Sequence, residues 1–133
     1  DCVYVSNHGG RQLDHGRGSL DVLPEVVAAV AGKAEVMVDG GFCRGSDIVK
    51  AIAMGAKAVG LGRLQGYAVA AAGQAGVVRM LEILEDEVQR CLGLMGVTSL
   101  KALDGACLHP AAPANPGHVL SAFPLLHIDE ETY

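Results

Sequence analysis

The order of strand-like and helix-like segments constrains the fold of this chain more than any other feature. Three short apolar runs have the length and composition of strands that are buried on both faces of a sheet, at residues 2–6, 35–39 and 58–61. Longer segments with helical spacing separate them. Strands that alternate with helices form right-handed βαβ units, so the sequence predicts an α/β fold with a parallel sheet.

The segments between and after these runs place apolar residues at helical spacing. The expected helices cover residues 20–31, 47–54, 66–72 and 76–95. For the second helix, Ser46 is the expected N-cap and Gly55 the expected end. Most acidic residues of the last helix lie off its apolar stripe and are expected to form a solvated face, namely Glu82, Glu85, Asp86 and Glu87.

The spacing between the predicted strands is close to that of a (β/α)8 barrel, which needs about 250 residues. The chain has 133 residues and begins with Asp1 rather than Met. We therefore expect it to be the C-terminal part of a longer barrel chain, with about three of the eight βα units. Residues 1–100 would form these units and a terminal helix. Residues 101–133, rich in Pro and Ala from Leu108 onward, would form an extended tail.

Charge and cysteine content argue against nucleic-acid binding and metal binding as functions of this chain. A net charge of −5 argues against a general nucleic-acid binder, although a few well-placed arginines suffice for a small anionic ligand. The four cysteines form no CxxC pair, and the five histidines lack ligand spacing, so we expect reduced thiols, a cytoplasmic location and no metal site. No apolar run is expected to reach the roughly 18 residues of a membrane span.

Unusual polar residues and glycines follow the end of each predicted strand. They are Ser6, Asn7, His8 and Arg11, then Asp39, Gly40, Gly41 and Arg44, and finally Gly62 and Arg63. The carboxyl ends of parallel strands form the active-site face of a barrel or an open α/β sheet. The sequence therefore predicts that these groups meet in one site.

The second and third strand ends have the features of a phosphate-binding site. Gly40 and Gly41 let the main chain approach a ligand closely, and Arg63 adds a charge-assisted hydrogen bond. The alternative is that these glycines only form tight turns. The series Gly60-x-Gly62-x-x-x-Gly66 differs in spacing from the dinucleotide fingerprint, so we do not expect a nicotinamide site.

His8 and Arg11 allow two interpretations. They can belong to an ordinary solvated turn. They can also act chemically, with His8 as a general base, the usual role of an imidazole, and Arg11 as the ligand of a substrate carboxylate.

Three stretches resemble the C-terminal half of the FMN-dependent α-hydroxy-acid oxidase and dehydrogenase family, which includes glycolate oxidase, lactate dehydrogenase and mandelate dehydrogenase types. They are VSNHGGRQLD (5–14), VDGGFCRGSDIVKAIAMGAKAVGLGR (38–63) and AAAGQAGVVRMLEILEDEVQRCLGLMGVTSL (70–100). The first stretch is highly specific to this family. The resemblance covers about the first hundred residues and implies FMN as the cofactor.

The resemblance also implies the reaction and the roles of single residues. An (S)-2-hydroxy acid would be oxidised to the 2-oxo acid, with FMN passing the electrons to oxygen, a cytochrome or a quinone. His8 would be the catalytic base and would bind substrate together with Arg11, which holds the carboxylate. The implied cofactor-binding residues are Ser6, Asp39, Gly40, Gly41, Phe42, Gly62 and Arg63. The full-length protein is expected to be a homo-oligomer.

The chain departs from the family pattern at two positions and lacks several family groups. Cys43 stands where the family has an arginine, and Leu64 where it often has a proline. The family's flavin lysine, substrate tyrosines and histidine-paired acid would lie upstream. We therefore expect weak or no turnover from these 133 residues alone. The alternative function is a non-catalytic half-barrel module that binds a phosphate or a flavin.

Overall fold

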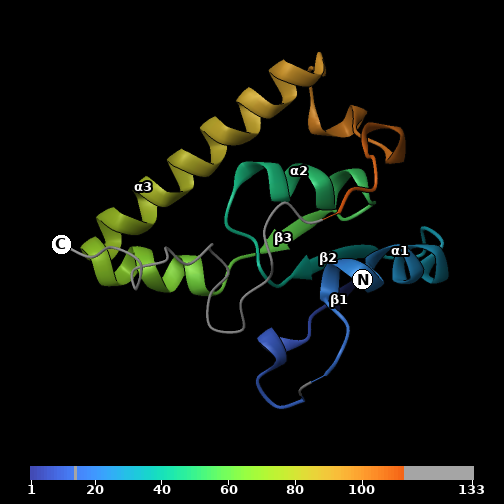
Figure 1. The fold of residues 1–133 in the computed structure, drawn as a ribbon, viewed down its shortest axis with the longest axis horizontal. Coiled ribbons are helices and arrows are strands. Elements are labelled where there is room, and N and C mark those ends of the chain that lie inside the picture. The colour runs from blue at the N-terminus through green and yellow to red at the C-terminus, as the bar shows by residue number, and fades with distance from the viewer. Residues whose placement is uncertain (14, 113–133) are drawn as a thin grey trace.

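The computed structural model describes residues 1–13 and 15–112, and its centre is a parallel sheet. The strands are β1 (Cys2–Val5), β2 (Glu35–Asp39) and β3 (Ala58–Gly60), and they lie in the order β1-β2-β3 (Figure 1). The predicted α/β fold with a parallel sheet is confirmed. Two strands end one residue earlier than predicted, at Val5 and Gly60.

Helices connect the strands and follow the last of them. They are α1 (Ser19–Val30), α2 (Gly45–Ala53) and α3 (Arg63–Met95), with short 3-10 turns η1 (His8–Gly10), η2 (Leu100–Ala102) and η3 (Gly105–Cys107). The second part of the long helix α3, drawn in yellow, runs obliquely past α2 in Figure 1. The order of elements is the alternation of strands and helices that the sequence predicts.

One face of the sheet carries the hydrophobic core. The register aligns Val3 with Val36 and Val5 with Val38, so these side chains share a face. Val38 and Leu23 of α1 are fully buried, and Ala51 of α2 packs in the same cluster. Both helices therefore cover the same face of the sheet.

The opposite face of the sheet carries Tyr4, Met37 and Asp39, and Tyr4 is 54% exposed. The prediction that the strands are buried on both faces is therefore wrong for the described part of the chain. Side chains alternate between the two faces, and both connecting helices pack on one of them.

The N-terminus of α2 differs from the prediction. The helix begins at Gly45, with Arg44 as the N-cap residue, and Ser46 lies inside its first turn. The carboxylate of Asp47 accepts hydrogen bonds from the backbone N–H groups of Cys43 (3.1 Å) and Arg44 (3.0 Å). An acidic side chain in the first turn thus accepts from the N-cap residue and its predecessor, and Ser46 is not the cap.

Glu87 of α3 also binds the N-terminus of α2. Its Oε1 lies 2.8 Å from Nε and 2.7 Å from Nη2 of Arg44, and its Oε2 accepts from the Gly45 backbone N–H at 2.7 Å. A Cβ atom at Gly45 would lie 2.5 Å from Cβ of Glu87, so only glycine allows this contact between α2 and α3. Glu87 therefore does not belong to a purely solvated face.

The helix α3 joins the two helices predicted at residues 66–72 and 76–95. It spans Arg63–Met95 in two helical parts, because Ala72 (φ −155°) and Gly73 (φ 56°) interrupt its helical backbone. The break falls close to the gap between the two predicted helices. Glycine suits this position because φ is positive there.

By length and composition alone, α3 is able to cross a membrane, with a mean hydropathy of 1.2 in its best 18-residue window. The prediction that no segment reaches such a length is therefore wrong. Valine, leucine and isoleucine, with smaller contributions from alanine, produce this hydropathy. Charged residues from Glu82 onward exclude later windows, so each qualifying window includes the break at Ala72 and Gly73.

The described residues that follow α3 pack against α2. Leu103 is buried against Val49 and Ala53 in a second small core cluster. The turns η2 and η3 lie within residues 100–107. The rest of the predicted tail, residues 113–133, lies outside the described residues.

We expect Glu87→Gln to lower the free energy of unfolding by about 1–2 kcal/mol at pH 7, because charge-assisted hydrogen bonds weaken. Arg44 and the Gly45 N–H hold the pKa of Glu87 below its usual value. The stabilisation is therefore fully present above that usual value and is lost as the pH falls through the lowered pKa.

Urea unfolding at pH 7 and in acid measures this difference. The control is Glu82→Gln, which removes an exposed ion pair with Arg79 and should cost less than about 0.5 kcal/mol. Equal effects of the two variants at pH 7 would contradict the assignment.

Candidate functional site

The ends of the three strands meet at one cavity of about 330 Å³. It therefore brings together residues that lie far apart in the sequence, as expected for the carboxyl edge of a parallel sheet. The lining residues are His8, Gly9, Asp39, Gly40, Gly41, Phe42, Cys43, Gly62, Arg63 and Leu64.

Glycines shape the wall formed after β2 and β3. Gly40 (φ 107°) and Gly41 (φ 79°) adopt backbone conformations that other residues rarely tolerate. A Cβ atom at Gly41 or Gly62 would meet nothing within 4 Å, so the main chain there borders open space. This geometry lets a ligand approach the main chain closely.

Asp39 brings an incompletely satisfied carboxylate to the cavity. Its Oδ2 accepts a hydrogen bond from the Tyr4 hydroxyl at 3.1 Å. Its Oδ1 is buried and has no hydrogen-bond partner among the described residues. An unpaired buried acceptor costs about 1–3 kcal/mol, and a ligand hydroxyl group would remove that cost.

The two arginines near the cavity have different surroundings. Arg63 is exposed, lines the cavity and is the first residue of α3, whose helix dipole favours an anion at this end. Arg44 is bound to Glu87 and does not line the cavity. Arg63 is therefore the cation available there.

Cys43, which follows Phe42 after the two glycines, also lines the cavity. Burial and the nearby Asp47 carboxylate raise the pKa of its thiol, against a smaller opposing effect of Arg63. The thiol is therefore neutral at pH 7. Its backbone N–H donates to Asp47, which removes that group as a ligand donor.

The loop after β1 places His8 at the edge of the cavity. Asn7 caps η1, with its Oδ1 accepting from the Gly9 N–H at 2.9 Å. His8 has a positive φ of 51°, and its backbone N–H donates to Ser6 Oγ at 3.1 Å. Its Nδ1 lies 2.8 Å from Oε1 of Gln12.

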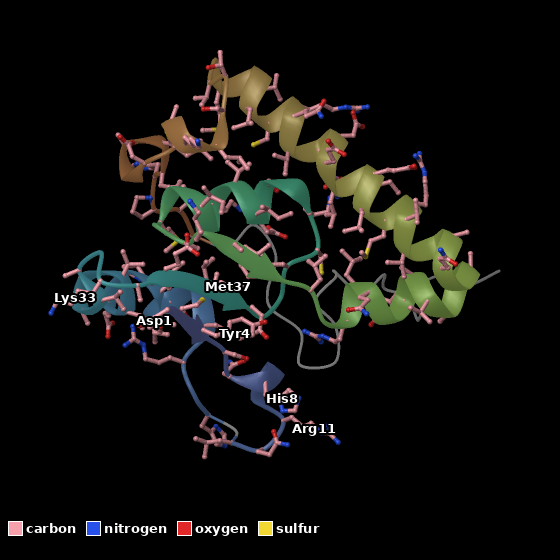
Figure 2. All side chains as sticks on the ribbon, turned by 180° about the vertical axis from the view of Figure 1, so that it is seen from behind. Asp1, Tyr4, His8, Arg11, Lys33 and Met37 are labelled. Atoms are coloured by element: carbon pink, nitrogen blue, oxygen red, sulfur yellow. The ribbon has the colours of Figure 1, made fainter. Side chains whose placement is uncertain are left out.

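Ser6 and Arg11 do not line the cavity, although both belong to the predicted site. Both are exposed, and Figure 2 shows Arg11 close to His8 on the loop after β1. The sequence reasoning gave no role to Tyr4 or Gln12. Tyr4 lies within an apolar run, where an aromatic residue is an ordinary strand former.

Across residues 1–13 and 15–112, no group of three or more His, Cys, Asp and Glu side chains could hold a metal ion. The four cysteines, all within these residues, are free thiols. The polar groups of the cavity suit an organic anion with hydroxyl groups better than a cation, because they combine Arg63, backbone N–H groups and one carboxylate.

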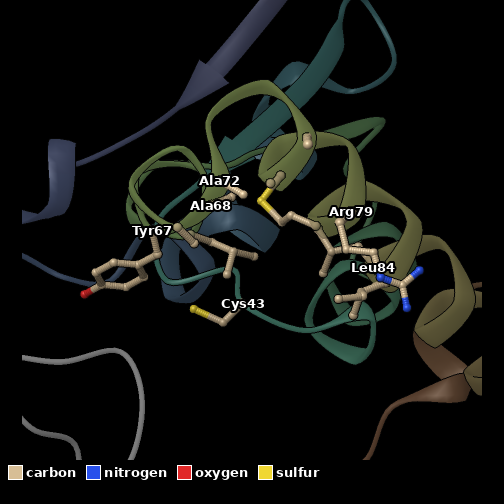
Figure 3. A pocket seen from close by; sticks show the side chains of 12 residues that line it. Cys43, Tyr67, Ala68, Ala72, Arg79 and Leu84 are labelled. Carbon is tan, nitrogen blue, oxygen red and sulfur yellow. The ribbon is translucent and has the colours of Figure 1, made fainter.

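A second cavity of about 610 Å³ lies along the two halves of α3 (Figure 3). Alanines, leucines and Met80 form most of its wall. Cys43 and Leu64 line both cavities, so they form a shared wall. The apolar lining distinguishes this cavity from the polar one at the strand ends.

A family model and several known proteins are similar to this chain. The FMN-dependent dehydrogenase family model matches residues 1–110. An L-lactate oxidase of Nostoc sp. is 51% identical over 108 residues, which cover 81% of this chain and 30% of the relative. A 4-hydroxymandelate oxidase of Amycolatopsis orientalis is 52% identical over 100 residues, which cover 75% of this chain and 28% of the relative.

Solved structures that are similar to this chain include FMN-containing oxidases as well. A mandelate oxidase variant with the monooxide FMN adduct superposes with a TM-score of 0.73 at 51% identity, and the match covers 76% of this chain and 32% of that one. The chain thus spans about 30% of the length of the curated relatives it matches. The family description and the FMN adduct identify FMN as the cofactor. The chain belongs to the FMN-dependent dehydrogenase family.

Proposed function

We propose that this chain is the C-terminal part, about three βα units, of a (β/α)8 barrel. The whole protein would catalyse FMN-dependent oxidation of an (S)-2-hydroxy acid to the 2-oxo acid. The observation that carries this proposal is that His8, Gly41 and Arg63, which follow three different strands, line the same cavity. β1 and β3 are the outer strands of the described sheet, which agrees with further strands on either side.

The cavity fits the polyol chain and phosphate of FMN. The carboxylate of Asp39 would accept hydrogen bonds from cofactor hydroxyl groups, since its Oδ1 lacks a donor. Main-chain N–H groups at Gly40, Gly41 and Gly62 and the guanidinium of Arg63 would hold the phosphate.

Phe42 and Ser6 would contribute in more limited ways. The Phe42 side chain is 5% exposed and packs in the core, so its main chain would provide the cofactor contact. The Ser6 oxygen accepts from the His8 N–H, and its hydroxyl proton is still available to the flavin.

His8 would act as the base that removes a proton from the substrate. If the Gln12 carbonyl oxygen accepts from Nδ1–H, the lone pair of the imidazole lies on Nε2, which would take the proton. Arg11 would bind the substrate carboxylate with two parallel hydrogen bonds. FMN bound in this cavity would supply the redox chemistry, taking two electrons from the substrate for transfer to oxygen, a cytochrome or a quinone.

The whole protein, rather than these 133 residues, would be the efficient enzyme, a cytoplasmic homo-oligomer. A second candidate is a non-catalytic module that binds a phosphate or a flavin. One observation favours it: the phosphate-facing groups line the cavity, whereas Arg11 does not. The two candidates differ in turnover and not in ligand binding.

We expect His8→Ala in the full-length protein to retain FMN while turnover falls about 10²–10⁴-fold, because a general base is lost. Flavin absorbance after desalting and anaerobic bleaching by L-lactate or L-mandelate measure the two properties. His109→Ala is the control, since His109 is exposed and outside the cavity. Turnover equal to that of the unaltered protein would exclude His8 as the base. Absence of bleaching in the unaltered protein would favour the binding module.

We expect Arg63→Ala to weaken FMN binding at least about tenfold and to leave riboflavin binding unchanged, since riboflavin lacks the phosphate. Quenching of flavin fluorescence measures both affinities. Arg79→Ala is the matched control, because Arg79 pairs with Glu82 and lies outside the polar cavity. Equal weakening of both ligands would contradict a phosphate contact.

A further inference from the structure

Tyr4 crosses the exposed face of the sheet toward the cofactor cavity. On β1 it is aligned with Met37 of β2, and the two lie near each other in Figure 2. Its hydroxyl reaches Asp39, two residues further along β2. A diagonal neighbour on an adjacent strand is within reach of a tyrosine side chain. Tyr4 therefore bridges β1 to the cavity without lining the cavity itself.

A glycine on the third strand makes room for this bridge. Gly60 of β3 is aligned with Asp39. A Cβ atom at Gly60 would occupy the place of the Tyr4 hydroxyl. At this point of the sheet β1 thus contributes the donor, Tyr4, and β2 contributes the acceptor, Asp39. The glycine of β3 leaves the space that the hydroxyl occupies.

The hydrogen bond fixes one oxygen of Asp39 and leaves the other without a donor. Oδ2 is held by Tyr4, and Oδ1 has no partner among the described residues. Partial burial, followed by the hydrogen bond and the charge of Asp39, raises the pKa of the Tyr4 hydroxyl. The hydroxyl is therefore protonated at neutral pH and acts as the donor.

We propose that Tyr4 is a positioning residue that orients the Asp39 carboxylate toward the polyol chain of the flavin. This inference rests on the proposed function, because it requires a flavin in the cavity. Tyr4 acts through Asp39 and touches no reacting atom. Its contribution therefore concerns the part of the cofactor between ring and phosphate, which FMN and riboflavin share.

Tyr4→Phe in the full-length protein tests the proposal, because it removes only the hydroxyl group. We expect the dissociation constants of FMN and riboflavin to rise by the same factor, about tenfold, the order expected for one hydrogen bond to a charged acceptor. In an Asp39→Ala background, which removes the acceptor of the Tyr4 hydroxyl, the same substitution should change neither constant. Fluorescence quenching of the two flavins provides the measurement.

Two further variants keep the test decisive. Tyr67→Phe is the control, since it removes the same atom from a tyrosine outside the polar cavity. Gly60→Ala places a Cβ atom at the position of the Tyr4 hydroxyl and 3.0 Å from Cβ of Asp39. It therefore breaks the bridge from both sides while retaining the tyrosine, and should weaken both flavins if Tyr4→Phe does not fold.

The outcomes separate the inference from the proposed function. Unchanged flavin affinities in Tyr4→Phe would overturn the positioning role alone, as would a loss of stability without a change in affinity. Weakening of FMN but not of riboflavin would also overturn it, because the effect would then lie at the phosphate. A full-length protein that binds neither flavin would overturn the proposed function and the inference together.

Discussion

The parallel direction of three adjacent strands is the constraint on which the rest of the structure depends. It brings the carboxyl ends of β1, β2 and β3 to one edge of the sheet, so the loops that follow them share a cavity. His8, Asp39 and Arg63 meet there although long stretches of sequence separate them. An antiparallel arrangement would place neighbouring loops at opposite edges.

The stability of the cavity wall comes from packing behind it. The core between the sheet and the helices fixes the directions in which the strands end, with Leu23 and Val38 fully buried. The loop from Gly40 to Arg44 continues directly into α2, and Glu87 holds that helix start against α3. The Glu87 carboxylate of α3 thereby supports the position of the binding loop that leads into α2.

Periodicity and turn residues were sufficient to predict the strands, most of the helices and the convergence of polar residues at one edge. These features are local, since they follow from alternation along a strand and spacing along a helix. The start of α2 was mispredicted because its donors are satisfied by Asp47 and by Glu87, the second of which is distant in sequence. Tyr4 was overlooked because an aromatic side chain in an apolar run gives no sign of its hydroxyl partner. The positions of Ser6 and Arg11 outside the cavity depend on the shape of a loop, which no periodic pattern encodes.

The wall shared by the two cavities makes residue 43 a boundary between a polar and an apolar space. Cys43 lines both the cavity at the strand ends and the space along α3. A substitution at this position would therefore change the chemistry of both spaces at once, because one side chain borders each of them.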